Sequence, residues 1–434
     1  MSCNWEKKKL RDVVELVIDN RGRNPKSYSE DGGIPVIDNY LIVSEAEVNL
    51  NEIKRYIDNE TYNTFIRKHI NGGDVLLTLV GNGYGKVAIT PNERCVIIQN
   101  TIGLRCNKDN DNQYLYYLLR ANRDSLMNLN RGAAQPSIKV GDVLNLEFNF
   151  PPVEIQKTTA CILGSIDKKI LSNTQANQTL EEMAQAIFKS WFVDFDPVKA
   201  KMNGEQPEGM DAATASLFPE KLVESELGLI PEGWDIATIK DFGSVVCGKT
   251  PSKKNADFYG GDVPFIKIPD THGKVFITET TDTLTQAGDE SQPKKRIPEN
   301  SICVSCIATV GQVFITTKPS HTNQQINSVV PHDANSLYYL LFKFKGLNKH
   351  FHDLASGGSA TLNMNTRTFS NIELVRPTAD VMEAFHNTIG GLMQKMLTNQ
   401  LENSTLAELR DTLLPKLLSG EIELGQAQEL AEVE

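Results

Sequence analysis

The stretches GKVAIT at residues 85–90 and GQVFIT at residues 311–316 are two versions of one sequence, and they decide the fold. Each is a short apolar run entered from a glycine, a pattern that predicts a strand following a turn. The same spacing of 226 residues recurs further along, where NLEF at 145–148 matches NIEL at 371–374. A period this long indicates a duplicated domain, because solenoid repeats span only about 20–50 residues. We therefore expect two similar halves related by a near two-fold axis, and a bipartite target.

Charge is distributed unevenly along the 434 residues, whose net charge is -11. Residues 1–150 carry 19 basic and 19 acidic side chains, and residues 231–377 carry 15 and 14, which leaves 10 basic and 22 acidic side chains elsewhere. A nearly neutral domain can still present a basic face, since affinity for nucleic acid follows local phosphate neutralisation. The overall acidity therefore does not exclude DNA binding by the two halves.

The setting is predicted from the first residues and from the cysteines. The start, MSCNWEKKKL, is charged where a signal peptide would be apolar, and no apolar run of about 18 residues occurs. Seven cysteines without a framework spacing fit a reducing compartment. We expect a cytoplasmic protein without disulfides.

Each half is followed by a segment with the period of a long helix. From 152 to 193, apolar residues recur in steps of three and four, and the second copy repeats those steps from 389 to 417. About 42 helical residues would span roughly 60 Å, a spacer on the scale of DNA. The alternative is an ordinary apolar stripe on a surface helix, which is far commoner than a long coiled coil.

Four asparagines interrupt these apolar seams at equivalent positions: Asn173 and Asn177 in the first copy, Asn399 and Asn403 in the second. A buried asparagine costs stability but fixes register, because only a matching polar layer satisfies its amide. We expect the two helices to pair, and to be antiparallel because the repeats would be related by a dyad. If these amides face solvent instead, the pairing is not needed.

The globular halves read as mixed α/β (α+β) domains. The runs 74–80, 86–90, 301–309 and 312–316 are predicted as strands between Gly, Asn and Pro. QYLYYLLR at 113–120, with its match at 336–343, is predicted as a short amphipathic helix.

Three motifs suggest ligands, but their context favours ordinary turns and strands. GSVVCGKT at 243–250 fits the phosphate-loop pattern, yet PSKKNADFYGG follows it with no helical period. CVSC at 303–306 has zinc-like spacing, but in a strand residues three apart point to opposite faces. GNGYG at 81–85 opens no helix and is interpreted as a turn. We predict no metal site and no bound cofactor in this chain.

Motifs of several catalytic classes are missing from the sequence. It contains no NPP[FYW] or DPP[FYW] for amino-methyl transfer, no HExxH and no GxSxG. The chain offers no assembled catalytic constellation, so we expect a recognition component and no enzyme of its own.

Five longer stretches resemble one family. TLEEMAQAIFKSWFVDFDPVKAK at 179–201 and LFPEKLVESELGLIPEGWDI at 217–236 resemble the central conserved region of specificity subunits of type I restriction-modification systems. TPSKKNADFYGGDVPFIK at 250–267 and RGAAQPSI at 131–138 resemble the opening and the closing turn of a target-recognition domain, and LRDTLLPKLLSGEIEL at 409–424 resembles the distal conserved region. The resemblance covers the chain nearly from end to end.

The resemblance implies a non-catalytic subunit that chooses the DNA sequence for its partners. Target-recognition domains at 1–150 and 231–377 would each read half of a split, asymmetric site. The central conserved region at 151–230 and the distal one at 378–434 would supply the paired helices. Two methylation subunits, which bind S-adenosylmethionine, would dock on the helices and modify adenine, and restriction subunits would add ATP and Mg-dependent translocation and cleavage. A coiled-coil adaptor that never touches DNA and a fused enzyme with unrecognised motifs remain alternatives.

Candidate contact residues are chosen by side-chain chemistry, since Arg and Lys suit guanine and phosphate, and Asn and Gln suit adenine. In the first domain the candidates for DNA binding are Arg21, Arg23, Asn82, Tyr84, Lys86, Gln135 and Ser137. In the second domain they are Lys249, Thr250, Ser252, Lys253, Lys254, Gln312, Thr361 and Asn363. For docking of methylation subunits the candidates are Phe188, Trp191, Phe192 and Phe195, for which packing within the chain is the alternative.

Overall fold

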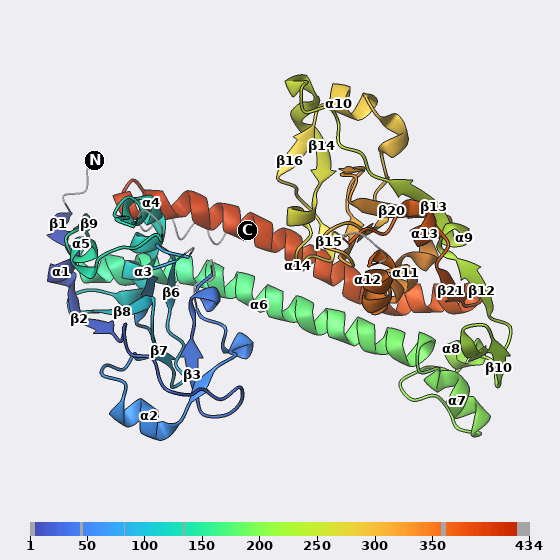
Figure 1. Ribbon diagram of the computed structural model, residues 1–434, viewed down its shortest axis with the longest axis horizontal. Helices are drawn as coiled ribbons and strands as arrows, with labels where there is room; N and C mark the ends of the chain where they lie inside the picture. Colours follow the sequence, from blue (N-terminus) through green and yellow to red (C-terminus); the bar gives the residue numbers. More distant parts are fainter. Residues whose placement is uncertain (1–4, 44–46, 82, 133–134, 357–361, 423–434) are drawn as a thin grey trace. The chain divides into compact units, whose positions relative to one another are not determined.

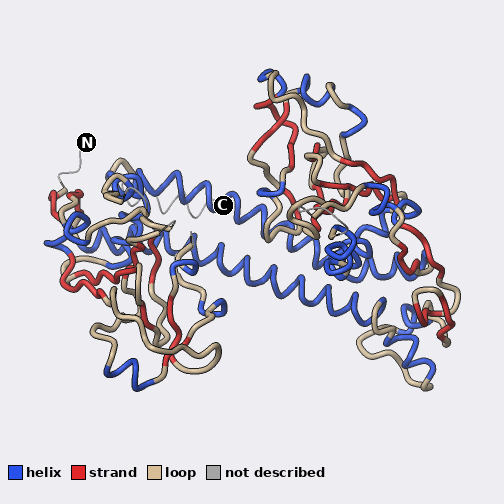
Figure 2. The backbone as a smooth tube through the Cα atoms, in the orientation of Figure 1, coloured by secondary structure: helices blue, strands red, loops and turns tan. Residues whose placement is uncertain are grey.

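The structure is a computed structural model that describes residues 5–43, 47–81, 83–132, 135–356 and 362–422. The chain divides into two compact units, unit 1 (Met1–Ser172 with Glu402–Glu434) and unit 2 (Asn173–Leu401). Two long helices, α6 (Val153–Phe192) and α14 (Ala379–Ser419), each contribute to both units. Both units contain strands and helices (Figure 2), so the predicted mixed fold with two long helices is confirmed.

Unit 1 is built on a four-stranded antiparallel sheet in the order β2-β8-β5-β6. A three-stranded sheet β4-β3-β7 and a ribbon β1-β9 complete it. Its strands are β1 (Glu6–Lys9), β2 (Val14–Asp19), β3 (Ile34–Ile37), β4 (Tyr56–Ile57), β5 (Val75–Thr78), β6 (Val87–Ile89), β7 (Val96–Ile97), β8 (Thr101–Cys106) and β9 (Glu147–Phe150). Its shorter helices are α1 (Leu10–Val13), η1 (Asn39–Leu41), η2 (Leu50–Glu52), α2 (Asn59–Thr64), α3 (Asn112–Ala121), α4 (Arg123–Met127) and α5 (Val140–Leu144).

Unit 2 repeats this plan, with the sheet order β13-β20-β17-β18-β15 and the smaller sheet β16-β14-β19. Its strands are β10 (Leu222–Ser225), β11 (Gly228–Pro231), β12 (Asp235–Thr238), β13 (Gly243–Cys247), β14 (Tyr259–Ile266), β15 (Phe276–Ile277), β16 (Asp282–Leu284), β17 (Ile302–Ser305), β18 (Val313–Thr316), β19 (His321–Thr322), β20 (Ile326–Pro331) and β21 (Glu373–Arg376). Its shorter helices are α7 (Asp196–Met202), α8 (Ala212–Ser216), α9 (Ile239–Phe242), η3 (Ala256–Phe258), η4 (Ile268–Asp270), α10 (Gln286–Glu290), η5 (Pro293–Lys295), η6 (Ala334–Ser336), α11 (Leu337–Gly346), α12 (Asn348–Ala355) and α13 (Thr366–Ser370). The four predicted strands correspond to β5, β6, β17 and β18.

Helices α3 and α11 are present where the sequence predicts them, and each is covered over more of its surface than a helix with one buried face. Six consecutive residues of α3, from 114 to 119, are buried. The reason is cover on two sides: one face of α3 packs on the sheet, while Tyr117 donates a hydrogen bond of 2.6 Å to Asp167 on α6. Helix α11 is enclosed in the same way, and its Lys345 pairs with Glu181 on α6. These two helices fasten each sheet to the long helices.

The long helices run antiparallel within each unit (Figure 1). In unit 1, Arg410 Nη1 of α14 lies 2.8 Å from an oxygen of Asp167 on α6, and Glu402 pairs with Lys169 at 3.3 Å. Going forward along α6 therefore means going backward along α14. No described helix is long and apolar enough to cross a membrane.

Candidate nucleic-acid interface

The end of strand β5 gathers three loops at one edge of unit 1. The backbone N–H of Leu79 donates to Asn100 O at 2.8 Å, and that of Ile138 donates to Leu79 O at 2.9 Å. The N–H of Gly81, whose φ is +91°, donates to Pro136 O at 3.1 Å. Because backbone groups bind one another here, the loops are held in place and their side chains remain free to meet a ligand.

Unit 2 builds the same edge at the end of β17. The N–H of Cys306 donates to Gln325 O at 2.7 Å, that of Met364 donates to Cys306 O at 2.8 Å, and that of Ala308 donates to Leu362 O at 3.0 Å. Ala308 has a φ of +63°, the left-handed conformation that Gly81 has in unit 1. The backbone of the edge is thus reproduced bond for bond in the two units.

Of the predicted residues of unit 1, Arg21, Gln135 and Ser137 lie on or beside this edge. Arg21 borders a shallow depression lined by Arg21, Gly22, Asn24, Val80, Gln99 and Asn100. Arg23 lies over the ring of Phe65, with its guanidinium carbon 5.5 Å from the ring centre. Gln135 is exposed and Ser137 is half-buried, and Asn82 lies outside the described residues.

Arg21 is already engaged by a carboxylate. It donates hydrogen bonds of 2.9 and 2.7 Å to the two oxygens of Asp19. Burial alone would raise the pKa of Asp19, but the hydrogen bonds and charge of Arg21 outweigh it and hold that pKa below its usual value. The guanidinium is therefore fixed in orientation, and much of its charge is compensated.

Lys86 lies away from that depression, in a second hollow. Its side chain lines this hollow together with Arg120 and Arg123, beside Gly85. Tyr84, from the same turn, packs partly against the core of unit 1. The turn at 81–85 agrees with its interpretation from the sequence, since both Gly81 and Gly85 have positive φ.

The predicted residues of unit 2 fall mainly on the segment that follows β13. Lys249, Ser252, Lys253 and Lys254 are exposed, and Thr250 donates to Gln324 Oε1 at 2.6 Å. Gln312 and Asn363 lie at the β17 edge, where Gln312 is half-buried and Asn363 is exposed; Thr361 lies outside the described residues. The structure thus brings Thr250 and Asn363 to one edge with amides that the sequence analysis did not select.

Those unselected amides are Gln99 and Asn100 in unit 1 and Gln324 and Gln325 in unit 2. Gln99 and Asn100 directly precede β8, and Gln324 and Gln325 directly precede β20. Gln99 has a φ of +62°, which is uncommon for a residue with a side chain and marks a constrained position. The signal that could have found them is the recurrence of an amide pair at the same place in both copies.

The seam asparagines include one direct pair. In unit 2, Asn399 Nδ2 donates to Asn177 Oδ1 at 2.9 Å, and Asn177 Nδ2 donates to Met396 O at 3.0 Å. In unit 1, Asn403 Nδ2 donates to Ile170 O at 3.3 Å. Asn173 is buried, with 5% of its surface exposed. Each of these three hydrogen bonds joins α6 to α14.

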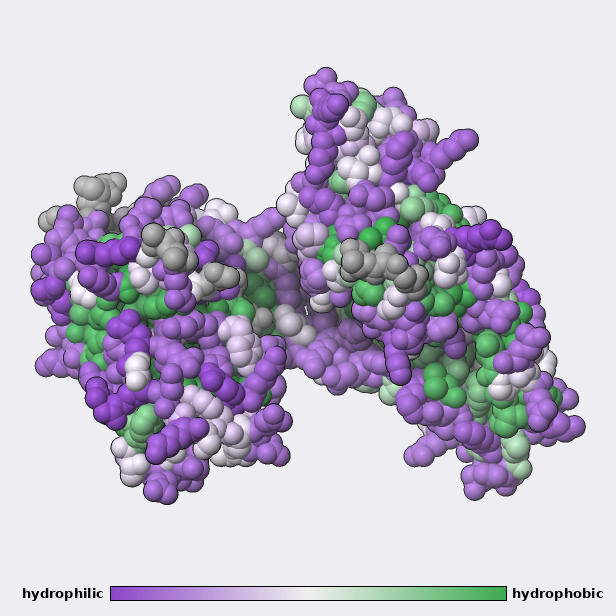
Figure 3. All heavy atoms as spheres, in the orientation of Figure 1, coloured by the Kyte–Doolittle hydropathy of each residue, from purple (hydrophilic) through white to green (hydrophobic). Residues whose placement is uncertain are grey.

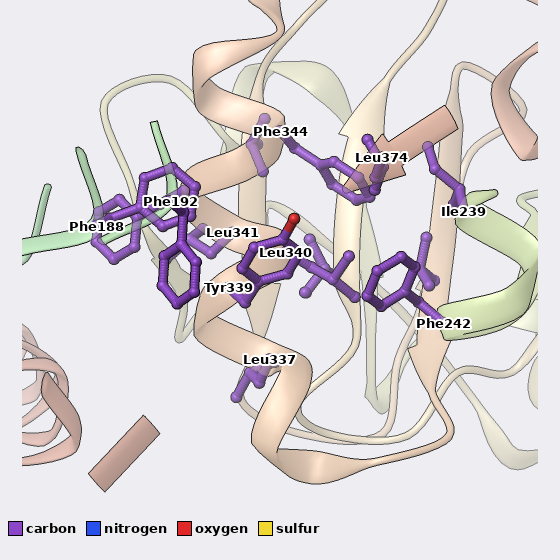
Figure 4. Close-up of a cluster of buried hydrophobic side chains, with 14 of the residues drawn as sticks. Phe188, Phe192, Ile239, Phe242, Leu337, Tyr339, Leu340, Leu341, Phe344 and Leu374 are labelled. Atoms are coloured by element: carbon purple, nitrogen blue, oxygen red, sulfur yellow. The ribbon is translucent and has the colours of Figure 1, made fainter. Parts of the chain in front are cut away.

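The aromatic residues at the end of α6 lie in the core of unit 2. Phe188, Trp191 and Phe192 are 3–6% exposed. Figure 4 shows Phe188 and Phe192 beside Tyr339 of α11, with ring centres 5.9 and 5.1 Å from that of Tyr339. Phe195, partly buried, packs edge to face on Trp234. Packing within the chain, the alternative to docking, is therefore the use these rings have here, and they offer a partner little surface.

Apolar side chains are exposed on the segment that follows these rings. They are Val193, Met202, Leu217, Val223, Leu227 and Leu229, between 36% and 57% exposed. In Figure 3 hydrophobic surface is visible over α8 at the lower right. We call these six residues the apolar surface of unit 2.

The ligand-like motifs adopt ordinary structure. Cys303 and Cys306 are buried, and burial raises the pKa of both thiols to about 12, so neither is poised to ionise. Within the described ranges, no group of three or more His, Cys, Asp or Glu side chains could hold a metal ion. The phosphate-loop pattern at 243–250 is followed by the short η3 (Ala256–Phe258), not by the longer helix that such a loop needs.

Comparisons with known proteins agree on one family. The model of the type I restriction modification DNA specificity domain matches residues 3–182 and 231–409. The HindI specificity subunit of Haemophilus influenzae is 42% identical over 404 residues, covering 82% of this chain and 88% of that protein. The MjaIX specificity subunit of Methanocaldococcus jannaschii is 25% identical over 98% of this chain and 94% of its own length. An S subunit structure from M. genitalium shares the fold, with a TM-score of 0.59, 15% identity and coverage of 95% of this chain and 96% of that one.

Proposed function

Since this chain belongs to the family of type I restriction-modification specificity subunits, we propose that it selects the DNA sequence on which its partner subunits act. Residues 1–150 and 231–377 are the two target-recognition domains in this proposal, and each reads one half of a bipartite, asymmetric site. The chain contributes no catalysis. It supplies the address, and the partners supply the chemistry.

One observation carries the proposal: two edges with the same backbone present different side chains. Asn100 of unit 1 is replaced by Gln325, and Ser137 is replaced by Asn363. The common backbone hydrogen bonds hold the loops, while the side chains determine which bases can be bound. Two readers of one design with different side chains suit a site whose halves differ.

Basic side chains near these edges are suited to anchoring the DNA backbone. In unit 1, Lys86, Arg120 and Arg123 share one hollow. In unit 2, Lys253 and Lys254 are exposed next to Thr250. Phosphate contacts position a protein on the duplex, and contacts to base edges give the specificity. Replacing Lys86 or Lys254 with an uncharged residue should therefore weaken binding to all DNA sequences alike.

The long helices serve as spacer and docking platform in this proposal, with 151–230 and 378–434 as the conserved regions. Two methylation subunits, which bind S-adenosylmethionine and modify adenine, dock there, and restriction subunits add ATP and Mg-dependent cleavage. Because Phe188, Trp191 and Phe192 are buried, we assign the methylation contact to the adjoining apolar surface of unit 2, whose exposed side chains would lose water-accessible area on binding.

A band-shift experiment tests the proposal. The chain, with and without co-expressed methylation subunits, is mixed with random-sequence duplexes, and the retained DNA is sequenced. We expect the complex to enrich two separate short blocks at a fixed distance. A coiled-coil adaptor would retain no DNA, and a fused methyltransferase would methylate DNA without the partner subunits; either result would contradict the proposal.

A further inference from the structure

A series of hydrogen-bonded, mostly buried polar side chains in unit 2 ends at the backbone of residues 249–254, which we call the recognition segment. His321, on β19, is fully buried, and its Nε2 lies 2.7 Å from Asp289 Oδ1 on α10. Its Nδ1 lies 3.4 Å from Gln292 Nε2. The same Gln292 nitrogen donates to the carbonyl oxygen of Lys249 at 2.8 Å. Arg296 closes the far end, 2.6 Å from the second oxygen of Asp289.

The hydrogen bonds fit a single protonation pattern. Nε2 of His321 carries the proton and donates a hydrogen bond to Asp289, which also pairs with Arg296. That leaves Nδ1 as an acceptor, so one N–H of the Gln292 amide can point at the ring and the other at Lys249. The His321 ring and the Lys249 carbonyl group thus both hold the nitrogen of the Gln292 amide.

The fold itself does not require this network. In unit 1 the positions equivalent to His321, Asp289 and Gln292 hold Val96, Tyr62 and Phe65, which belong to an apolar cluster. The place beside α2 is therefore filled by packed rings, with His69 against Tyr62 and the guanidinium groups of Arg94 and Arg23 over Tyr62 and Phe65. Buried polar groups cost stability unless they are all satisfied, so this set of side chains, which differs from that of unit 1, points to a use specific to unit 2.

The recognition segment is fixed at the point where the network reaches it. Lys249 N–H donates to Thr322 O at 2.9 Å, while its C=O accepts from Gln292, so both backbone groups of this residue are bound. A Cβ at the preceding Gly248 would lie 2.1 Å from Asn323 O, so the segment passes very close to the β19–β20 loop. The direction taken by residues 250–254 depends on these attachments.

We propose that His321, Asp289 and Gln292 are positioning residues that set the recognition segment 249–254 for sequence discrimination by unit 2. The proposal rests on the proposed function of that segment. None of the three needs to touch DNA: they act through the carbonyl group of Lys249. In unit 1 the buried Asn20 instead donates to Lys68 O and Ile97 O, so changes at His321, Asp289 or Gln292 should affect only the half-site that unit 2 reads.

The test uses four variants of the full chain, each assembled with methylation subunits. Gln292→Met keeps the length of the side chain and removes the donor to Lys249. His321→Gln keeps an amide near the position of Nε2 but loses the Nδ1 acceptor, and His321→Asn does the reverse. Gln286→Leu is the matched control, because Gln286 is an exposed amide on α10 that bonds only Glu290 among the interactions described. Random-sequence duplexes are methylated with S-adenosylmethionine, and the methylated molecules are sequenced.

We expect Gln292→Met and His321→Gln to lower base preference in the block read by unit 2 by about tenfold, on the order of the effect of losing the hydrogen bond to one partly buried carbonyl group. His321→Asn should lose less than about threefold, because its amide oxygen can replace Nδ1 as acceptor for Gln292. The other block, and both blocks for Gln286→Leu, should be unchanged. If His321 only stabilised the fold, both His321 variants would instead lose base preference equally, or total methylation would fall without a change in base preference.

Two outcomes separate the proposals. If the unmodified complex shows no base preference in either block, the proposed function fails. If it shows two blocks, yet Gln292→Met and His321→Gln keep the unit 2 preference within about twofold, the positioning proposal fails and the proposed function stands. Should Gln292→Met not fold, the comparison of His321→Asn with His321→Gln decides the matter.

Discussion

The asparagine pair between α6 and α14 predicts an asymmetry between two otherwise similar substitutions. Asn399 is 1% exposed, and its Nδ2 donates to Asn177 Oδ1 at 2.9 Å. Its own Oδ1 is buried and has no hydrogen-bond partner among the described residues. Asn177 is only half-buried and also donates to Met396 O. The two partners therefore differ in what they lose when the other is removed.

Asn177→Leu should be the damaging change. It leaves both polar ends of Asn399 buried and unpaired, which costs about 1–3 kcal/mol for the newly unpaired donor. Asn399→Leu removes a buried oxygen that was already unpaired and leaves Asn177 within reach of water, so we expect a change of less than about 1 kcal/mol. The double variant removes the polar layer and should regain about 2 kcal/mol relative to Asn177→Leu; the coupling energy of the pair is this gain plus the cost of Asn399→Leu alone.

Urea unfolding of the full chain measures these differences. Two of the three tryptophans, Trp191 and Trp234, lie in unit 2 and are buried, so their fluorescence follows the unit that contains the pair. A double-mutant cycle then gives the coupling energy. If Asn177→Leu is no less stable than Asn399→Leu, or if the double variant is the least stable of the three, the reasoning is refuted.

Three further predictions concern the two units. Asp167→Ala leaves Arg410, which is 11% exposed, with the exposed Asp411 as its remaining carboxylate partner among the described residues, and it removes the acceptor of Tyr117, so it should destabilise unit 1 by about 3 kcal/mol in urea unfolding, whereas a loss below about 1 kcal/mol would contradict a buried ion pair. Gly248→Ala places a Cβ 2.1 Å from a backbone oxygen and should lower the base preference of unit 2 in sequenced methylation products, while Gly346→Ala, with nothing within 4 Å, should not. Burial lowers the pKa of His386, so its neutral form contributes stability above about pH 6.5 that is lost as the pH falls through the lowered folded-state pKa. In melting curves between about pH 7 and pH 5, the fall should be shallower for His386→Gln, and an equally steep fall would count against this.

Sequence periodicity was enough to predict several strands, the two long helices and the duplication of the domain. The apolar runs gave β5 and β17 because strands buried on both faces read as continuous apolar stretches. The seam of α6 was readable because a 40-residue helix repeats its buried positions many times, among them Leu163 and Ala184. Local pattern predicted α3 but not its six consecutive buried residues, because these result from cover by distant segments.

The site was less predictable because it depends on contacts between distant parts of the chain. His321 and Asp289 are 32 residues apart, and the first copy, with Val96 and Tyr62, gives no hint of their pairing. The asparagine layer shows the same limit: equivalent positions were recognisable, but in an antiparallel pair Asn177 meets Asn399, the equivalent of Asn173. Large aromatic residues such as Phe188 suit both cores and interfaces, so only packing distinguishes the two uses.

The central claim is that two similar recognition domains in a single chain provide the address for a DNA-modifying complex. Mapping methylated adenines across the host genome, with and without this gene, tests it most directly. We predict a motif of two different specified blocks separated by an unspecified gap of fixed length, and its complete loss when the gene is deleted. An unchanged methylation map, or a lost motif that forms one uninterrupted block, would contradict the account.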